Sequence, residues 1–93
     1  MIVAITGINS GLGRSLVPKL QSEPAVEKII GIDLVEYQGN SDKIEFHQLD
    51  VRDVEGIEQA LRDVDILIHL AFIVVPKKYL LNPKGSTYAA PAF

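Results

Sequence analysis

Residues 6–13 have the sequence TGINSGLG and stand between two segments of regular apolar pattern. Residues 2–5 are apolar without interruption, which is typical of a strand buried on both faces of a parallel sheet. Residues 11 to about 21 have helical spacing, with Ser10 as the expected N-cap. The strand–glycines–helix order predicts a loop that holds a diphosphate at the helix N-terminus.

Each of the three glycines has an expected part in this loop. Gly7 permits the tight turn, Gly11 lets the backbone approach a pyrophosphate, and Gly13 lets the helix pack closely on the strand. Ser10 and Leu12 complete the residues that we expect at the pyrophosphate. The alternative is a glycine-rich turn that binds no ligand.

Three further strands are predicted. Residues 28–33 form a second apolar run that ends in Asp33. Residues 44–49 alternate between apolar and polar, which suits an outer strand with one wet face. Residues 65–70 are predicted as a fourth, buried strand, and the polar stretch 38–43 as a loop.

The two helices carry specific expectations. Pro18 lies beyond the first turn of the first helix, where it predicts a kink or an early end. Asp53 is the expected N-cap of a second helix that continues to about residue 62. The details expected of this helix are inward-facing Val54, Ile57 and Leu61 and an ion pair between Glu58 and Arg62.

The resulting order of elements predicts an α/β fold, the first half of a Rossmann-type parallel sheet with strand order 3-2-1-4. Residues 1–75 are the expected dinucleotide-binding half-domain and residues 76–93 an irregular tail. The fourth strand would then be an exposed apolar edge, which favours pairing with another strand. We expect the chain to be truncated, with completion by another chain or dimerisation at this edge as alternatives.

Composition limits the classes of partner. Residues 1–75 carry 6 basic and 12 acidic side chains, which argues against nucleic-acid binding, and residues 76–93 carry three lysines. These lysines are too few to predict a membrane patch, and the apolar run 66–75 is shorter than a membrane span. Without cysteines or a signal-peptide pattern at the start, a cytoplasmic location is expected.

Asp33 indicates which dinucleotide the loop takes. It ends the second strand 20 residues after Gly13, where a carboxylate can accept hydrogen bonds from both ribose hydroxyls of the adenosine. A 2′-phosphate would meet like charge there, so NAD is favoured over NADP. Arg14 could instead pair with a phosphate, and a solvated Asp33 is a further alternative.

The loop spacing T-G-x-x-x-G-x-G resembles the cofactor loop of the short-chain dehydrogenase/reductase superfamily. Asp50-Val51 resembles its acidic-aliphatic pair beside the adenine, and His69-Leu70-Ala71 is similar to the H-L-A of the extended branch, the NAD-dependent epimerases and dehydratases. The resemblance covers residues 1 to about 75. The loop departs from the extended branch, which spaces its glycines T-G-x-x-G-x-x-G.

The resemblance implies an enzyme that transfers hydride between NAD and a hydroxyl or carbonyl substrate, often a sugar nucleotide. It implies adenine contact for Asp50 and Val51, although Asp50 could be only a turn residue, and places Ala71 and Phe72 toward the nicotinamide. From the residues themselves, His69 is expected to be structural, bonded to backbone, and His47 to point outward. Neither histidine has the spacing of a metal site.

Catalytic residues are not assigned. The resembled enzymes use a tyrosine with a lysine four positions later, and this pair is absent: Ser41, Pro83 and Ala92 follow Tyr37, Tyr79 and Tyr88 at that spacing. Whether the chain belongs to an enzyme therefore stays open, and a non-catalytic dinucleotide-binding sensor is the alternative. A Rossmann-like methyltransferase fits less well, since H-L-A has no role there.

Overall fold

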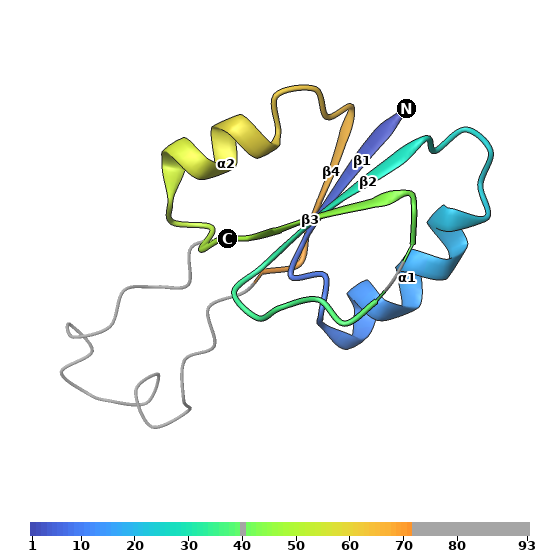
Figure 1. The fold of residues 1–93 in the computed structure, drawn as a ribbon, viewed down its shortest axis with the longest axis horizontal. Helices are drawn as coiled ribbons and strands as arrows, with labels where there is room; N and C mark the ends of the chain where they lie inside the picture. Colours follow the sequence, from blue (N-terminus) through green and yellow to red (C-terminus); the bar gives the residue numbers. More distant parts are fainter. Residues whose placement is uncertain (40, 72–93) are drawn as a thin grey trace, which may run out of the picture.

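The computed structural model describes residues 1–39 and 41–71, which form a parallel sheet with one helix on each face (Figure 1). The sheet has four strands in the order β3-β2-β1-β4, as predicted. In chain order the elements are β1 (Ile2–Thr6), α1 (Gly11–Gln21), β2 (Lys28–Asp33), β3 (Ile44–Gln48), α2 (Val54–Ala60) and β4 (Ile66–His69). The expected tail, residues 76–93, lies outside the described residues.

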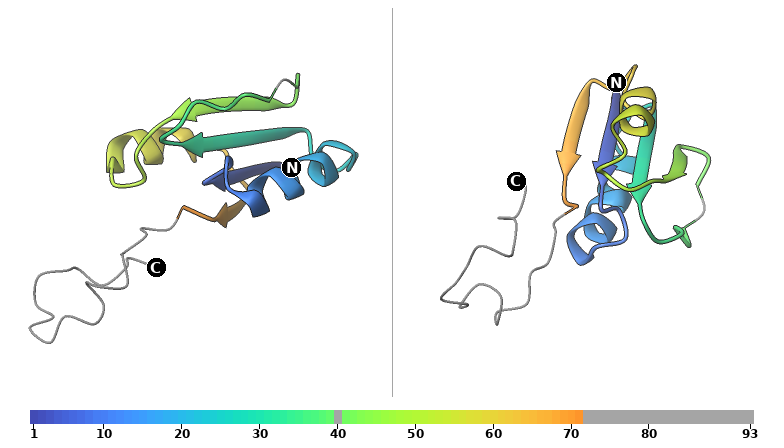
Figure 2. Two further views of the ribbon diagram at one scale, coloured as in Figure 1. Left: turned by 90° about the horizontal axis from the view of Figure 1, so that it is seen from below. Right: turned by 90° about the vertical axis from the view of Figure 1, so that its left-hand side faces the viewer.

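The strand β1 lies in the middle of the sheet, paired with β2 on one side and β4 on the other (Figure 2). Its side chains alternate between the two faces, because successive residues of a strand point in opposite directions. Val3 and Ile5 pack with Val17 of α1, whereas Ala4 belongs to the cluster that Ile57 of α2 covers. The two helices therefore bury opposite faces of the same strands, as Figure 1 shows with the sheet seen along its edge.

The helix α1 begins as expected and does not end early. The Oγ atom of Ser10 accepts a hydrogen bond from the amide of Gly13 at 3.0 Å, which confirms the N-cap. The helix continues through Pro18 to Gln21. Val17 is buried on the sheet beside the proline, and this packing stabilises the turn in which the proline removes a backbone donor.

The helix α2 differs from its prediction. Asp53 caps it, accepting a hydrogen bond from the amide of Gly56 at 3.1 Å, and Ile57 and Leu61 pack on the sheet. However, the helix ends at Ala60, before the predicted residue 62, and Val54 is 65% exposed rather than inward-facing. Because the chain leaves the helix at Leu61, the i,i+4 geometry is lost, and the described residues contain no Glu58–Arg62 ion pair.

Of the two outer strands, β3 matches its prediction and β4 does not in full. The alternating strand β3 lies at one edge, and Tyr37 from the loop before it packs on Phe46, with ring centroids 6.0 Å apart. At the other edge, β4 is shorter than predicted and less buried, with Ile66 46% and Leu67 47% exposed. Within the described residues this apolar strand pairs only with β1.

Candidate functional site

The glycine loop lies at the carboxyl end of β1, between the ends of β2 and β4 (Figure 1). Gly7 has φ +70°, the left-handed conformation that glycine adopts without strain. Its amide donates to the carbonyl of Ile32 at 2.7 Å. On the other side, a Cβ at this position would lie 2.8 Å from the carbonyl carbon of Leu70. Gly7 is therefore required both by its backbone conformation and by its contact with β4.

Ile8 anchors the loop, a role that the sequence pattern did not predict. Its side chain is fully buried and covers Gly31 of β2, where a Cβ would lie 2.6 Å from the Cδ1 atom of Ile8. The signal was present in the sequence as one large apolar residue within a polar loop and one glycine within an apolar strand. The contact between Ile8 and Gly31 holds the loop against the α1 face of the sheet.

Gly13 allows a close contact, although not the predicted one with the strand. A Cβ on Gly13 would lie 2.5 Å from the carbonyl oxygen of Ile8 and 2.9 Å from that of Gly7. The first turn of α1 thus packs on the backbone of the loop itself. Any side chain at Gly13 would push the helix N-terminus away from the loop.

The other side of this helix terminus is open. A Cβ on Gly11 would have no neighbouring atom within 4 Å, and Leu12 is 59% exposed. The amides of these two residues lie in the first helical turn, where no helix carbonyl can accept from them. An open surface with free amides at the positive end of a helix suits an anionic diphosphate.

Asp33 lies beside the loop, as its position in the sequence predicted. Its Oδ2 atom accepts a hydrogen bond from the amide of Asn9 at 3.0 Å, and its Oδ1 atom accepts from the amide of Val35 at 3.1 Å. These two hydrogen bonds from backbone amides fix the direction of the carboxylate and leave further lone pairs for hydroxyl donors. Arg14, the residue that could instead pair with a phosphate, is exposed on α1.

Asp50 and Val51 follow β3, at the same carboxyl edge of the sheet. The carboxylate of Asp50 binds the Arg52 guanidinium, with Oδ2 2.6 Å from Nη2, and Oδ1 also accepts from the Arg52 amide at 2.9 Å. These bonds lower the pKa of Asp50 to about 2. The Asp50 carbonyl accepts from the amide of Asp53 at 2.9 Å, so Asp50 does form the turn before α2. Its expected adenine contact stays a prediction.

Thr6 joins the loop to the end of β4. Its buried Oγ1 atom lies 3.1 Å from the amide of Leu70 and 3.3 Å from that of Ala71, both donors, and 2.6 Å from Nδ1 of His69. Among the described residues the ring of His69 thus bonds a side-chain hydroxyl, and its expected backbone partner stays a prediction. Ala71 lies next to Gly7, whereas Phe72 lies outside the described residues.

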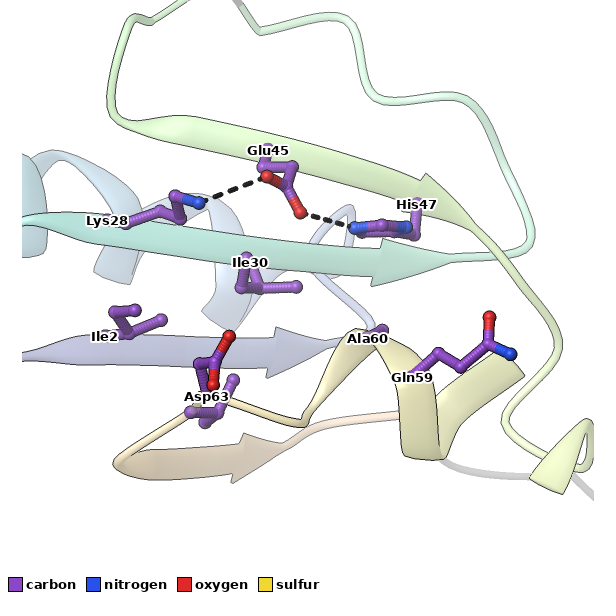
Figure 3. A pocket seen from close by; sticks show the side chains of 9 residues that line it. Ile2, Lys28, Ile30, Glu45, His47, Gln59, Ala60 and Asp63 are labelled. Atoms are coloured by element: carbon purple, nitrogen blue, oxygen red, sulfur yellow. Dashed lines mark hydrogen bonds and ion pairs between the residues drawn. The ribbon is translucent and has the colours of Figure 1, made fainter. Parts of the chain in front are cut away.

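A separate pocket lies on the α2 face of the sheet (Figure 3). At its rim Glu45 lies 3.2 Å from Nζ of Lys28 and 2.7 Å from Nε2 of His47. The hydrogen bond from His47, and then that from Lys28, lowers the pKa of Glu45. The lining residues are Ile2, Lys28, Ile30, Glu45, His47, Gln59, Ala60, Asp63 and Val64. The pocket thus contains no residue of the glycine loop.

The residues at the carboxyl edge fit the adenosine diphosphate half of a dinucleotide. They supply open amides at a helix N-terminus and a carboxylate fixed at the end of the neighbouring strand. A parallel 3-2-1-4 sheet with these features defines a Rossmann-type dinucleotide-binding unit. The sequence matches the NAD dependent epimerase/dehydratase family over residues 3–89, and the chain belongs to this family.

Solved structures share this fold. A uronate dehydrogenase variant from Agrobacterium tumefaciens in complex with NAD is 26% identical, with a TM-score of 0.69 over 80% of this chain and 27% of the other. The L-threonine dehydrogenase of Clostridium difficile is 26% identical, with a TM-score of 0.67 over 89% and 27%. The dTDP-glucose 4,6-dehydratase DesIV of Streptomyces venezuelae, with NAD and TYD bound, is 24% identical, with a TM-score of 0.70 over 88% and 30%.

The chain spans less than a third of the length of each of these structures. None of the curated proteins compared with the chain matches it. In the part of the chain that the structure describes, neither helix has the length and apolar character needed to cross a bilayer. The family and the NAD-bound uronate dehydrogenase variant together support a domain that binds a nicotinamide dinucleotide.

Proposed function

We propose that the chain is the NAD-binding part of an NAD-dependent epimerase, dehydratase or dehydrogenase, with NAD preferred over NADP. The observation that carries this proposal is the carboxylate of Asp33, which the amide of Asn9 holds beside the glycine loop. A carboxylate in this position accepts bonds from the ribose hydroxyls and repels a 2′-phosphate.

Each of the predicted site residues is assigned to one part of the cofactor. Asp33 receives the ribose, and Asp50 and Val51 contact the adenine. Ala71 and Phe72 lie toward the nicotinamide side. The pyrophosphate lies on the helix terminus, against Gly7, Ser10, Gly11, Leu12 and Gly13. When bound, NAD supplies or accepts hydride at C4 of its nicotinamide.

The proposed substrate class is a hydroxyl or carbonyl compound, with sugar nucleotides the leading group. The neighbours are named for uronate, L-threonine and dTDP-glucose, which are hydroxyl or carbonyl compounds of different kinds. The residues of this chain account for cofactor binding, and the 93 residues contain no Tyr-x-x-x-Lys pair. A dinucleotide-binding sensor without chemistry is therefore the second candidate.

Calorimetric titration of the chain with NAD and with NADP tests the cofactor assignment. Wild type should bind NAD more tightly, and Asp33→Ala should weaken NAD about tenfold or more while shifting the preference toward NADP. Asp63→Ala is the matched control, because it removes the same charge from an exposed residue on the α2 face. Absence of NAD binding, or an unchanged preference in Asp33→Ala, would overturn the proposal.

Turnover separates the enzyme from the sensor. The gene product that carries this chain should reduce NAD, or interconvert sugar nucleotides in its presence. Tight NAD binding without turnover of any hydroxyl or carbonyl substrate would favour the sensor.

A further inference from the structure

Asn9 of the glycine loop forms a closed ring of hydrogen bonds with Asp33 and Val35 at the end of β2. The amide of Asn9 donates to Oδ2 of Asp33 at 3.0 Å, and the amide of Val35 donates to Oδ1 at 3.1 Å. The side-chain Nδ2 of Asn9 completes the ring by donating to the carbonyl of Val35 at 2.6 Å. Asn9 thus holds both the carboxylate and the turn on which the carboxylate depends.

Hydrophobic burial contributes little to this turn. Leu34 and Val35 are 61% and 64% exposed, so their side chains do not anchor the backbone that follows Asp33. Hydrogen bonds do so instead: Asn9 binds the carbonyl of Val35, and Nε2 of Gln48 donates to the carbonyl of Leu34 at 3.0 Å. Of these two side chains, only that of Asn9 lies within the ring around Asp33.

We propose that Asn9 is a specificity-determining residue. It holds the carboxylate of Asp33 in place and thereby maintains the preference for NAD over NADP. A 2′-phosphate could be admitted if the carboxylate of Asp33 turned away from the ribose. In the ring, that rotation breaks a hydrogen bond from a backbone amide at each carboxylate oxygen. The like charge therefore stays where the phosphate would lie, and its repulsion cannot be relieved by a local movement.

Removal of the Asn9 side chain should loosen this arrangement without removing the charge. In Asn9→Ala the amide of residue 9 still faces Asp33, but the carbonyl of Val35 loses its donor. The Val35 turn can then move, and Asp33 can follow it. Binding of NAD should change little, because the side chain of Asp33 remains available to the ribose hydroxyls, whereas binding of NADP should improve.

The inference rests on the proposed NAD site, and one set of titrations tests both. Wild type, Asn9→Ala, Asn9→Ser and Gln48→Ala are each titrated with NAD, NADP, AMP and 2′,5′-ADP, and their folding is checked by circular dichroism. Loss of the Asn9 hydrogen bond should lower the ratio of the NADP Kd to the NAD Kd by about three- to tenfold. The same change is expected in the 2′,5′-ADP to AMP ratio, whereas Gln48→Ala should keep both ratios.

The outcomes distinguish the two proposals. If wild type binds neither NAD nor AMP, the proposed function fails and the inference fails with it. If wild type prefers NAD and Asp33→Ala changes the ratio, but neither Asn9 variant does, only the inference is overturned. An equal change in Gln48→Ala would also overturn it, since general loosening of the turn would then explain the result. Asn9→Ser, whose short hydroxyl cannot replace the amide donor, provides the test if Asn9→Ala does not fold.

Discussion

Gly7 and Leu70 lie in such close contact that a Cβ on Gly7 would be 2.8 Å from both the carbonyl carbon and the carbonyl oxygen of Leu70. This contact brings the glycine loop against the chain that leaves β4, two segments far apart in the sequence. The Cα hydrogen of Gly7 occupies the space that a methyl group would need. The backbone there is also left-handed, with φ +70°, so two independent constraints require glycine.

Gly7→Ala should therefore destabilise the protein. The left-handed conformation costs an L-residue roughly 1–2 kcal/mol, and the clash with Leu70 adds to this cost because the neighbouring atoms are backbone. We expect the free energy of unfolding to fall by about 2 kcal/mol or more. Urea denaturation followed by circular dichroism measures it, and a variant as stable as wild type would show that the loop can move away from β4.

Gly11→Ala should weaken NAD binding without destabilising the protein. Gly11 is the first residue of α1, with no atom near the position of a Cβ, so alanine should leave stability unchanged or raise it by up to about 1 kcal/mol. The new methyl group would nevertheless stand on the surface proposed for the pyrophosphate. NAD affinity should fall about tenfold, or about 1.4 kcal/mol. Calorimetry with unfolding of the same sample checks both, and unchanged affinity would place the pyrophosphate elsewhere.

Thr6→Val tests the second connection between the loop and β4. The hydroxyl of Thr6 is the acceptor for the amide of Ala71 at 3.3 Å, and valine removes it with almost no change in shape. An unsatisfied polar group costs about 1–3 kcal/mol, so the free energy of unfolding should fall by that amount.

Thr6→Ser is the control for this prediction, because it keeps the hydroxyl and loses only a methyl group, worth about 0.8 kcal/mol. If Thr6→Val proved as stable as wild type, the hydroxyl would have no part in holding the end of β4.

Most of the fold could be predicted because strong local patterns coincide with the topology rules. The uninterrupted apolar runs gave the central strands, and the alternation in residues 44–48 placed β3 at an edge. The caps at Ser10 and Asp53 were predictable because each capping bond joins residues three apart. The end of α2 at Ala60 and the exposure of Val54 were not predictable, because helix ends and the orientation of terminal residues depend on tertiary packing rather than on local spacing.

The site was predictable only where spacing determines chemistry. Gly7 and Asp33 lie where their spacing placed them, whereas Gly13 makes its close contact with the loop backbone and not with the predicted strand. Ile8 and Asn9 were missed, because their partners Gly31 and Val35 lie 23 and 26 residues away in the sequence. A local pattern marks Ile8 and Gly31 as unusual in their segments but does not pair them, and both pairs exist only once β1 and β2 are side by side.

Arg52→Ala should change the titration of Asp50. The side-chain hydrogen bonds of Arg52, and then its backbone amide, lower the pKa of Asp50 from 3.8 to about 2. Since the pKa is lower in the folded state, the interaction stabilises the protein above about pH 3.8 and is lost as the pH falls through about 2. Without the guanidinium the pKa should rise toward 3.8, but not fully, because the backbone amide remains.

Carboxyl-carbon NMR of Asp50 between pH 1.5 and 6 measures this shift directly. Arg62→Ala is the matched control, because Arg62 is also an exposed arginine next to α2 but makes no bond to Asp50 among the described residues. It should leave the titration of Asp50 as in wild type. A titration midpoint in Arg52→Ala that stays near 2 would mean that the turn amides alone hold the charge.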